Sequence, residues 1–272
     1  MSAGSVRLVA TDLDGTLLRV DDTISERTRA AIRDADAAGV LVVAATGRGW
    51  RSALPLLEQV PEVRTAVCSN GALIRDIAGS ATTDAFTMEP DHVDAVVDAV
   101  RRAAPEAGLA WELVDGGFGF DPIFEELRSV GRARRPDLVA DRPAHSAADP
   151  VLKLLVRHPV LQEVEALRLL QPVVPDGVEL TSSGYGLVEV TGHDVHKARA
   201  LGVLCDRLGI GAGEVVALGD NRNDVEMLRW AGRGVAMGNA VPVAVAEADE
   251  QTAHHMDDGV AIVIEDVLAG IR

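Results

Sequence analysis

The sequence predicts a doubly wound α/β fold with a parallel sheet, interrupted by a second domain of the α+β type. Residues 1–82 and 190–272 alternate short apolar strands with amphipathic helices, the order of parallel strands joined by right-handed crossovers. Residues 83–189 lose this alternation and give the order helix, two strands, an irregular stretch, strand, helix and two strands. We therefore expect a core domain at 1–82 and 190–272, and an inserted antiparallel sheet with helices on one face at 83–189.

Four apolar, partly β-branched runs are the expected strands of the core, and polar residues follow each of them. These runs are residues 6–10, 40–45, 65–69 and 215–218. Ser25 is the expected N-cap of a helix to about residue 38, and Asp194 is the expected N-cap of the helix that carries Lys197. Because the carboxyl ends of parallel strands share one edge, where ligands bind, the polar residues after the strands are candidate site residues.

The net charge argues against one large class of partner. The chain has 272 residues, with 26 basic against 42 acidic side chains and a formal charge of −16. Nucleic-acid backbones require a basic face, and single strands require aromatic platforms, whereas this chain has three Trp, one Tyr and four Phe. We expect no nucleic-acid partner. An acidic chain that acts on an anionic phosphate ester must build local positive charge, which a divalent metal would supply.

The two cysteines and the apolar runs indicate a reducing, aqueous compartment. Cys68 and Cys205 lie in apolar segments without CxxC spacing, so buried, reduced thiols are expected rather than a disulfide or a metal site. No signal-peptide pattern precedes Asp12, and no apolar run reaches the length of a membrane span. We expect a cytoplasmic protein without membrane contact, and no segment predicts an obligate protein partner.

The first candidate motif follows the first strand. Residues 12–16 read Asp-Leu-Asp-Gly-Thr, so two carboxylates stand at the carboxyl end of a strand, and Gly15 lets the backbone turn closely behind them. The second motif, Thr46-Gly47-Arg48, follows the next strand. It offers a hydroxyl and an unhindered backbone N–H that could hold a phosphate oxygen.

The remaining motifs come after the inserted domain, and together the four sets suit phosphate chemistry. Residues 219–224 read Gly-Asp-Asn-Arg-Asn-Asp, and Lys197 stands in the first turn of a helix, where the helix dipole disfavours a cation. Hydrolysis of a phosphate monoester brings an anionic nucleophile to a dianion, so it requires cations and fixed donors. Lys197 is such a cation, and carboxylate oxygens are ligands suited to Mg²⁺. The candidate carboxylates are Asp12, Asp14, Asp220 and Asp224.

These motifs, in this order, resemble the haloacid dehalogenase (HAD) superfamily over the whole chain. The closest resemblance is to its Cof-type branch of sugar-phosphatase-like enzymes, which have a Rossmann-like core and a type IIB cap between the second and third motifs. One departure surrounds Lys197, because the family often has a small or hydroxyl residue before this lysine and glycine after it. This chain has His196 and Ala198 instead.

The resemblance implies a role for each motif residue. Asp12 would be the nucleophile that forms an aspartyl-phosphate and would also bind Mg²⁺. Asp14 would be the general acid and then the general base, with its backbone carbonyl on the metal. Asp220 would be the third protein ligand of the metal, and Asp224 a supporting carboxylate near it. The phosphate would be contacted by the backbone of Leu13 and by Thr46, Gly47, Lys197 and Asn223.

The resulting prediction is a Mg²⁺-dependent phosphatase that acts on a small phosphorylated metabolite, with a sugar phosphate as the model substrate. One alternative is a phosphotransferase or phosphomutase of the phosphomannomutase type, which resembles this core and cap. The other is a non-catalytic regulator that binds a metabolite. A dehalogenase is disfavoured, because Asp14 would have no task in halide displacement but is needed to protonate an alkoxide.

Three further groups of residues have ordinary structural interpretations. The aromatic residues of the inserted domain are expected in its core rather than against substrate. They are Trp111, Phe118, Phe120 and Tyr185. Arg132, Arg134 and Arg135 are expected in a solvated loop, and His254-His255 on the surface rather than on a metal.

Overall fold

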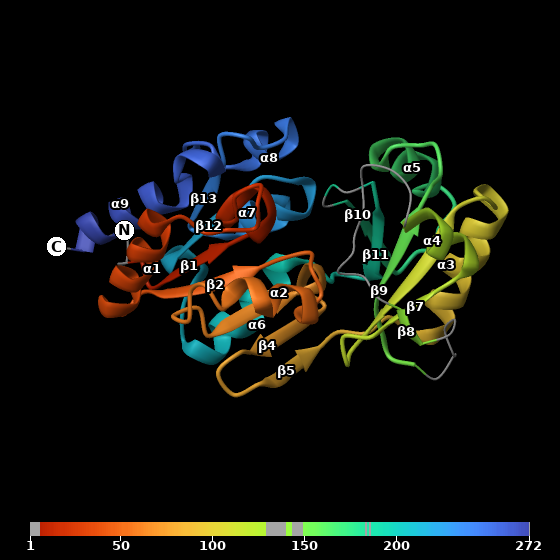
Figure 1. The fold of residues 1–272 in the computed structure, drawn as a ribbon, viewed down its shortest axis with the longest axis horizontal. Helices are drawn as coiled ribbons and strands as arrows, with labels where there is room; N and C mark the ends of the chain where they lie inside the picture. Colours follow the sequence, from red (N-terminus) through yellow and green to blue (C-terminus); the bar gives the residue numbers. More distant parts are fainter. Residues whose placement is uncertain (1–5, 129–139, 143–148, 183, 185, 272) are drawn as a thin grey trace. The chain divides into compact units, whose positions relative to one another are not determined.

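The computed structural model describes residues 6–128, 140–142, 149–182, 184 and 186–271, which form two compact units (Figure 1). The core unit comprises Met1–Asp84 and His196–Arg272, and the inserted unit comprises Ala85–Val195. The chain thus passes between the units after Asp84 and after Val195, where the sequence suggested boundaries after 82 and after 189. The first boundary lies later because residues 81–85 add a strand to the core sheet.

The core unit is built on an eight-stranded sheet in the order β14-β13-β12-β1-β2-β3-β4-β5. Neighbouring strands from β14 to β3 are parallel, and β4 is antiparallel to β3. The strands are β1 (Leu8–Thr11), β2 (Leu41–Ala45), β3 (Thr65–Cys68), β4 (Leu73–Asp76), β5 (Ala81–Ala85), β12 (Val215–Gly219), β13 (Arg233–Ala236) and β14 (Glu250–Gln251). The chain winds outward from the central β1 in both directions, which confirms the predicted doubly wound core.

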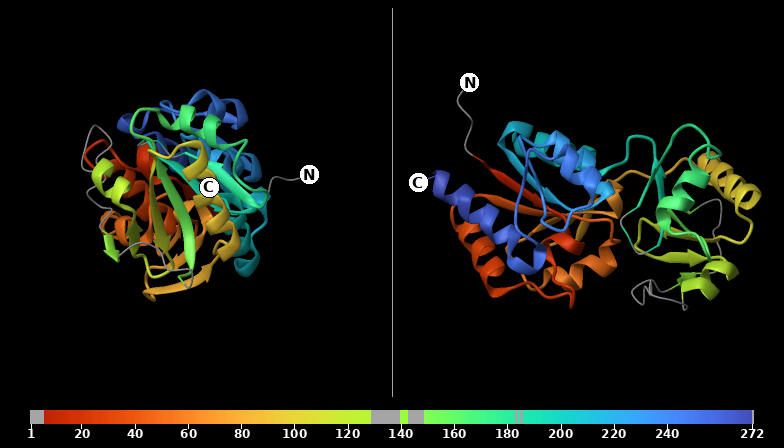
Figure 2. Two further views of the ribbon diagram at one scale, coloured as in Figure 1. Left: turned by 90° about the vertical axis from the view of Figure 1, so that its right-hand side faces the viewer. Right: turned by 90° about the horizontal axis from the view of Figure 1, so that it is seen from above.

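Two helical layers cover this sheet (Figure 2). The helices of the core unit are α1 (Glu26–Ala37), α2 (Trp50–Leu57), α6 (Lys197–Leu208), α7 (Val225–Trp230), α8 (Pro242–Glu247) and α9 (Gly259–Ile271). The crossovers β1–α1–β2 and β12–α7–β13 run in opposite directions along the sheet, so right-handed connections place α1 and α7 on opposite faces. α1 packs on α9, while α7 packs on α6 and α8.

Local hydrogen bonds explain where two of these helices begin. The Ser25 hydroxyl accepts a hydrogen bond from the backbone N–H of Thr28 at 3.0 Å, which confirms the predicted cap of α1. The predicted cap of α6 is wrong. Asp194 has a φ of 57°, in the left-handed region, whereas the extended His196 caps the helix by accepting from the N–H of Arg199. Lys197 is therefore the first helical residue.

The inserted unit contains a six-stranded sheet in the order β10-β11-β9-β6-β7-β8, antiparallel except between β7 and β8. The strands are β6 (Gly108–Leu113), β7 (Phe118–Phe120), β8 (Ala140–Arg142), β9 (Val151–Arg157), β10 (Val178–Thr181) and β11 (Val188–Gly192), and the helices are α3 (Pro90–Ala103), α4 (Pro122–Arg128) and α5 (Glu163–Leu170). A hairpin whose turn contains Asp115-Gly116 joins β6 and β7. A second antiparallel pair is formed by β10 and β11.

The helices of this unit do not share one face of its sheet, which corrects the prediction. Helices α3 and α5 pack with Leu109 and Leu154, whereas Phe124 of α4 packs with Ala110 and Leu155. Successive residues of a strand point to opposite faces, so α4 lies on the face opposite α3 and α5. The sequence pattern does not predict α4, because it is a short helix with a single fully buried side chain.

Both cysteines are buried, as predicted, and neither forms a disulfide. Within the part of the chain that the structure describes, none of the helices has both the length and the apolar character needed to cross a bilayer.

Candidate active site

The register of the core sheet brings the first and last acidic motifs to one edge. Thr11, the final residue of β1, pairs with Ala44 of β2 and with Leu218 of β12. Asp12 follows Thr11 directly, and Asp220 follows Leu218 by two residues, so both leave the sheet at the carboxyl ends of adjacent strands. The backbone N–H of Asp12 donates to the Leu218 carbonyl at 3.0 Å and continues the ladder to that point. The two segments are thereby held together although they are far apart in sequence.

Lys197 joins these segments through its side chain. Its Nζ donates to Oδ1 of Asp12 at 2.7 Å and to Oδ1 of Asp224 at 2.6 Å. Lys197 and Asp224 have no exposed surface, and Asp12 is 4% exposed. A buried ammonium group is stabilised only when it is paired and hydrogen-bonded, and here two carboxylates provide that pairing. His196 and Ala198, the two departures from the family pattern beside this lysine, do not prevent it from reaching the carboxylates.

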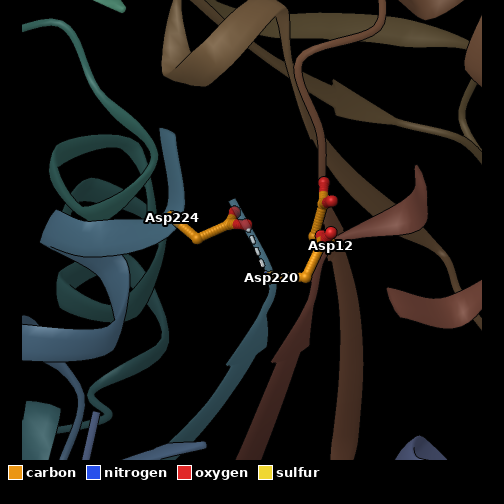
Figure 3. Close-up of side chains that lie close together, drawn as sticks. All are labelled: Asp12, Asp220 and Asp224. Carbon is orange, nitrogen blue, oxygen red and sulfur yellow. Dashed lines mark hydrogen bonds between the residues drawn. The ribbon is translucent and has the colours of Figure 1, made fainter. Parts of the chain in front are cut away.

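Three carboxylates converge at this point. Asp12, Asp220 and Asp224 each present an oxygen, and these oxygens lie within 4.8 Å of one another (Figure 3). The cluster carries three formal negative charges against the single charge of Lys197. Hard carboxylate oxygens at this spacing, with an excess of negative charge, fit a divalent cation such as Mg²⁺.

The three carboxylates differ in the hydrogen bonds that they accept. Oδ2 of Asp224 accepts from the backbone N–H groups of Asp220 and Asn221, both at 2.9 Å, and its Oδ1 accepts from Lys197. Both oxygens of Asp224 therefore support the loop and the lysine. Oδ2 of Asp12 accepts no hydrogen bond from any residue that the structure describes, so it is the better placed oxygen for a metal or a phosphorus atom.

Gly15 permits the close approach of the first motif to Asp220. Its φ is 75°, in the left-handed region that favours glycine, and a Cβ built at this position would overlap the Asp220 carboxylate. The neighbouring Thr16 hydroxyl donates to Oδ1 of Asp220 at 3.2 Å. The motif glycine is thus required both for the turn and for the space that Asp220 occupies.

Burial shifts the pKa values of the clustered groups. Burial raises the pKa of Asp12 well above its ordinary value, Lys197 opposes this, and the charges of the neighbouring aspartates add to it. Burial, followed by the charge of Asp224, raises the pKa of Asp220 to about 7. Burial lowers the pKa of Lys197, but the charges of Asp12 and Asp224 outweigh this and raise it overall. Lys197 thus stays charged, while Asp12 and Asp220 bind protons more readily than ordinary aspartates, because one lysine does not neutralise three clustered carboxylates.

Asp14 lies outside the three-carboxylate cluster and is bound by Arg48. The guanidinium donates from Nε to one carboxylate oxygen at 2.7 Å and from a terminal nitrogen to the other at 2.5 Å. The same terminal nitrogen lies 3.3 Å from Asp22. A planar, bidentate pair of this kind fixes the orientation of a carboxylate. The second motif by itself predicts no role for Arg48, and the structure shows that it orients the carboxylate of the first motif.

The candidate phosphate-binding residues lie on four segments of the core unit. Thr46 is fully buried, and its hydroxyl accepts from the backbone N–H of Arg48 at 3.0 Å, which shapes the loop that contains Gly47. Leu13 is also fully buried, in the irregular turn Leu13–Leu17 that follows β1. Asn223 is 6% exposed. The fourth segment is the start of α6, with Lys197.

Asn239 is a residue of this region that the motifs do not identify. Its Nδ2 donates to the Gly15 carbonyl at 2.8 Å and lies 3.4 Å from Oδ2 of Asp220, while its Oδ1 accepts from the N–H of His255. It therefore ties the turn after β1 to the acidic loop after β12. The sequence contains a weak signal for it, because Asn239 is a polar residue three positions after the end of β13.

The remaining residues named in the sequence analysis are the aromatic residues of the inserted unit, three arginines and two histidines. Trp111 packs in the core of the inserted unit with the sheet and α3, and Phe118 and Phe120 pack with Phe124, as expected for core aromatics. Tyr185 and the arginines at 132, 134 and 135 lie outside the described residues. His254 and His255 stack on each other at 4.6 Å and are half-buried, and Nδ1 of His255 lies 2.7 Å from the Leu18 carbonyl.

Comparisons with known proteins agree with this architecture. The family model for haloacid dehalogenase-like hydrolases matches residues 9–264. The chain is 29% identical to a Bacillus subtilis 5-amino-6-(5-phospho-D-ribitylamino)uracil phosphatase, YcsE, over 95% of this chain and 94% of that protein. It is 30% identical to the HMP-PP phosphatase of Serratia proteamaculans, over 87% of this chain and 85% of that protein. The HAD subclass IIB sugar phosphatase BT4131 has the same fold, with a TM-score of 0.80 at 23% identity over 96% of this chain and 98% of that one.

The doubly wound core, the inserted α+β unit and the acidic cluster define a hydrolase of the phosphatase class. Within that class the chain belongs to the haloacid dehalogenase-like hydrolases and is a Cof-type member. The resemblance inferred from the four motifs is thereby confirmed.

Proposed function

We propose that this enzyme hydrolyses a small phosphorylated metabolite, using Mg²⁺ and a phosphorylated Asp12 as the intermediate. The observation that supports this most directly is the arrangement around Lys197. It binds one oxygen of Asp12, and the other oxygen of Asp12 accepts no hydrogen bond from the described residues. A carboxylate held in this way has a fixed orientation and a reactive oxygen, which nucleophilic catalysis requires.

Asp12, Asp220 and the backbone carbonyl of Asp14 would hold the Mg²⁺, with Asp224 as support through Lys197 and the loop N–H groups. When bound, the metal would neutralise charge on the carboxylates and on the substrate phosphate. The protein groups perform the remaining tasks. Thr46, Gly47, Lys197, Asn223 and the backbone of Leu13 would bind the phosphate oxygens and orient the phosphorus toward Asp12.

The reaction would proceed in two displacements. In the first, Oδ2 of Asp12 forms a bond to phosphorus while the bond to the leaving oxygen breaks, and Asp14 gives that oxygen a proton. In the second, Asp14 takes a proton from a water molecule that attacks phosphorus, and the bond to Asp12 breaks. Each step is easier than direct attack of water on the ester. Arg48, which binds both oxygens of Asp14, must release the carboxylate before Asp14 can donate a proton.

The substrate class is a small phosphomonoester, with sugar phosphates and phosphorylated sugar alcohols as the first candidates. Two considerations support this. The similar proteins are named for a phosphoribitylamino-uracil, for HMP-PP and for a sugar phosphate, so this fold accepts several small phosphorylated molecules. The formal net charge of −16 disfavours polyanionic polymers as substrates. We further propose that the inserted unit, Ala85–Val195, acts as the cap that determines the leaving group.

The direct test is release of inorganic phosphate from a panel of phosphorylated sugars, sugar acids, nucleotides and flavin mononucleotide. The panel is run with Mg²⁺ and with a chelator. Release that depends on Mg²⁺ would support the proposal, and the ranking of substrates would identify the preferred leaving group. A folded protein that binds Mg²⁺ but releases no phosphate from any substrate would contradict it.

The variant Asp12→Asn tests the nucleophile. We expect it to abolish turnover, because the amide cannot form the phosphorylated intermediate, while the fold is retained. Phosphate release is measured beside thermal unfolding, and substantial residual hydrolysis by this variant would refute the assignment of Asp12.

A further inference from the structure

The turn after β3 has an unusual backbone. Ser69, Asn70 and Gly71 all have positive φ values, of 53°, 57° and 97°. A positive φ costs free energy at a non-glycine residue. Two consecutive non-glycine residues keep this conformation only where contacts with the surrounding structure stabilise it. Ser69, Asn70 and Gly71 are also buried. This segment, which we call the Asn70 turn, contains none of the residues of the four motifs.

The Asn70 turn is bonded to the loop of the second motif. The backbone N–H of Ser69 donates to the Arg48 carbonyl at 2.9 Å, and the backbone N–H of Asn70 donates to the Thr46 carbonyl at 3.0 Å. These two bonds hold the Thr46–Arg48 loop from the side of the neighbouring strand. The left-handed conformation of the turn is what directs both N–H groups toward that loop.

The turn also contacts the start of helix α6. A Cβ built on Gly71 would overlap the backbone carbonyl of His196 and the backbone nitrogen of Lys197. Only glycine leaves the space that this approach needs, and its φ of 97° independently favours glycine. The first turn of α6, which carries Lys197, is therefore seated against the Asn70 turn.

The side chain of Asn70 reaches the acidic loop after β12. Oδ1 of Asn70 accepts a hydrogen bond from Nδ2 of Asn223 at 3.0 Å, across 153 residues of sequence. Asn70 is 2% exposed and Asn223 is 6% exposed. Among the described residues, nothing donates to Oδ1 of Asn223, although this atom is buried. The Asn223 amide is thus oriented by Asn70 and leaves part of its hydrogen-bonding capacity unused by the fold.

We propose that Asn70 is a positioning residue for the phosphate-binding groups, and that it acts by orienting the Asn223 amide. The turn that holds Asn70 touches three of the four segments assigned to phosphate binding, through Thr46, the start of α6 and Asn223. Each of these contacts is with a group that would bind phosphate. We therefore expect Asn70 to affect binding of phosphate more than binding of Mg²⁺. This inference rests on the proposed function and adds a residue to its site.

The test measures binding of two simple probes by titration calorimetry, Mg²⁺ alone and inorganic phosphate in the presence of saturating Mg²⁺. The variant is Asn70→Gly, which removes the amide and adopts a φ of 57° without strain. Ser80→Gly is the matched control, because Ser80 also has a positive φ of 52° but lies in the exposed connection between β4 and β5. Asn70→Ser is the second variant if Asn70→Gly fails to fold, since two serines of the described residues, Ser69 and Ser80, adopt this conformation.

We expect Asn70→Gly to weaken phosphate binding by about 10-fold or more, the usual effect of losing a partner that orients a ligand-binding group. Mg²⁺ binding should stay within about twofold of the unaltered protein, and Ser80→Gly should change neither. Combining Asn70→Gly with Asn223→Ala should weaken phosphate binding no more than Asn223→Ala alone, because both act through one amide.

Three results would overturn the inference while the proposed function survives. The first is phosphate binding by Asn70→Gly within about twofold of the unaltered protein. The second is a double variant whose loss of phosphate affinity equals the product of the two single losses. The third is an equal loss of Mg²⁺ and phosphate binding in Asn70→Gly, because a general loss of structure would explain both. Failure of the unaltered protein to bind phosphate at all would overturn the proposed function itself, and the inference with it.

Discussion

The raised pKa of Asp220 predicts an unusual dependence of stability on pH in the metal-free enzyme. The folded pKa of about 7 lies well above the ordinary value of 3.8. The folded state therefore holds this proton more tightly than the unfolded chain, so the stabilisation is complete below about pH 4 and is lost as the pH rises through about 7. Between pH 5 and pH 8 the linkage relation gives a loss of about 2–3 kcal/mol from this group alone.

The variant Asp220→Asn removes the titrating group while keeping its shape. In the presence of a chelator, the unfolding free energy of the unaltered enzyme should fall relative to that of the variant by about 2–3 kcal/mol from pH 5 to pH 8. For a unit of this size that is a relative shift of roughly 5–10 °C in Tm. The assay is thermal unfolding followed by circular dichroism across that pH range.

Addition of Mg²⁺ supplies the second half of this test. A metal that displaces the proton from Asp220 binds more tightly as the pH rises, so the Mg²⁺-induced increase in Tm should be larger at pH 8 than at pH 5. The variant Asp220→Asn should lose most of that increase. Parallel pH profiles for the two proteins in chelator would refute the reasoning, because they would mean that Asp220 has an ordinary pKa in the folded state.

Two other substitutions test the same cluster. Lys197→Met should lower the free energy of unfolding by about 3–5 kcal/mol in chelator, because it leaves the buried carboxylates of Asp12 and Asp224 without their cation. Urea unfolding measures this free energy, and a loss below about 1 kcal/mol would contradict the prediction. Gly15→Ala should lower Mg²⁺ affinity by more than 10-fold, because its methyl group would displace Asp220. Gly39→Ala is the control, since Gly39 has a similar φ of 79° with open space around it, and equal effects of the two on Mg²⁺ titrations would contradict the steric argument.

The fold of the core unit follows from local pattern to a large extent. Apolar runs that end at polar residues predict β1, β2, β3 and β12, because strands buried on both faces consist almost entirely of apolar residues. The elements that the pattern does not predict are short or little buried. Strand β5 alternates between exposed and half-buried residues, and β14 has two residues, both exposed. Such elements form because the edge of a neighbouring strand offers backbone N–H and C=O groups for pairing. The sequence of the added strand itself contains no periodic pattern that predicts this pairing.

The start of α6 shows a different limit of local reasoning. Asp194 is a good N-cap residue by type, but the chain turns there with a positive φ, and the helix begins three residues later with His196 as its cap. The position is fixed by packing, because Gly71 admits the His196 carbonyl. A contact over more than a hundred residues of sequence therefore decided where this helix begins.

By itself the sequence determined the candidate carboxylates, because parallel strands end at one edge and polar residues after buried strands gather there. It also identified Lys197, as a cation in the first turn of a helix. Only the tertiary structure decided which of these groups contact one another. The contact of Lys197 with Asp12 spans 185 residues, and those of Asn70 with Asn223 and of Asn239 with Gly15 span 153 and 224. Distances of a few ångströms between such segments depend on register and helix packing, which composition and periodicity do not specify.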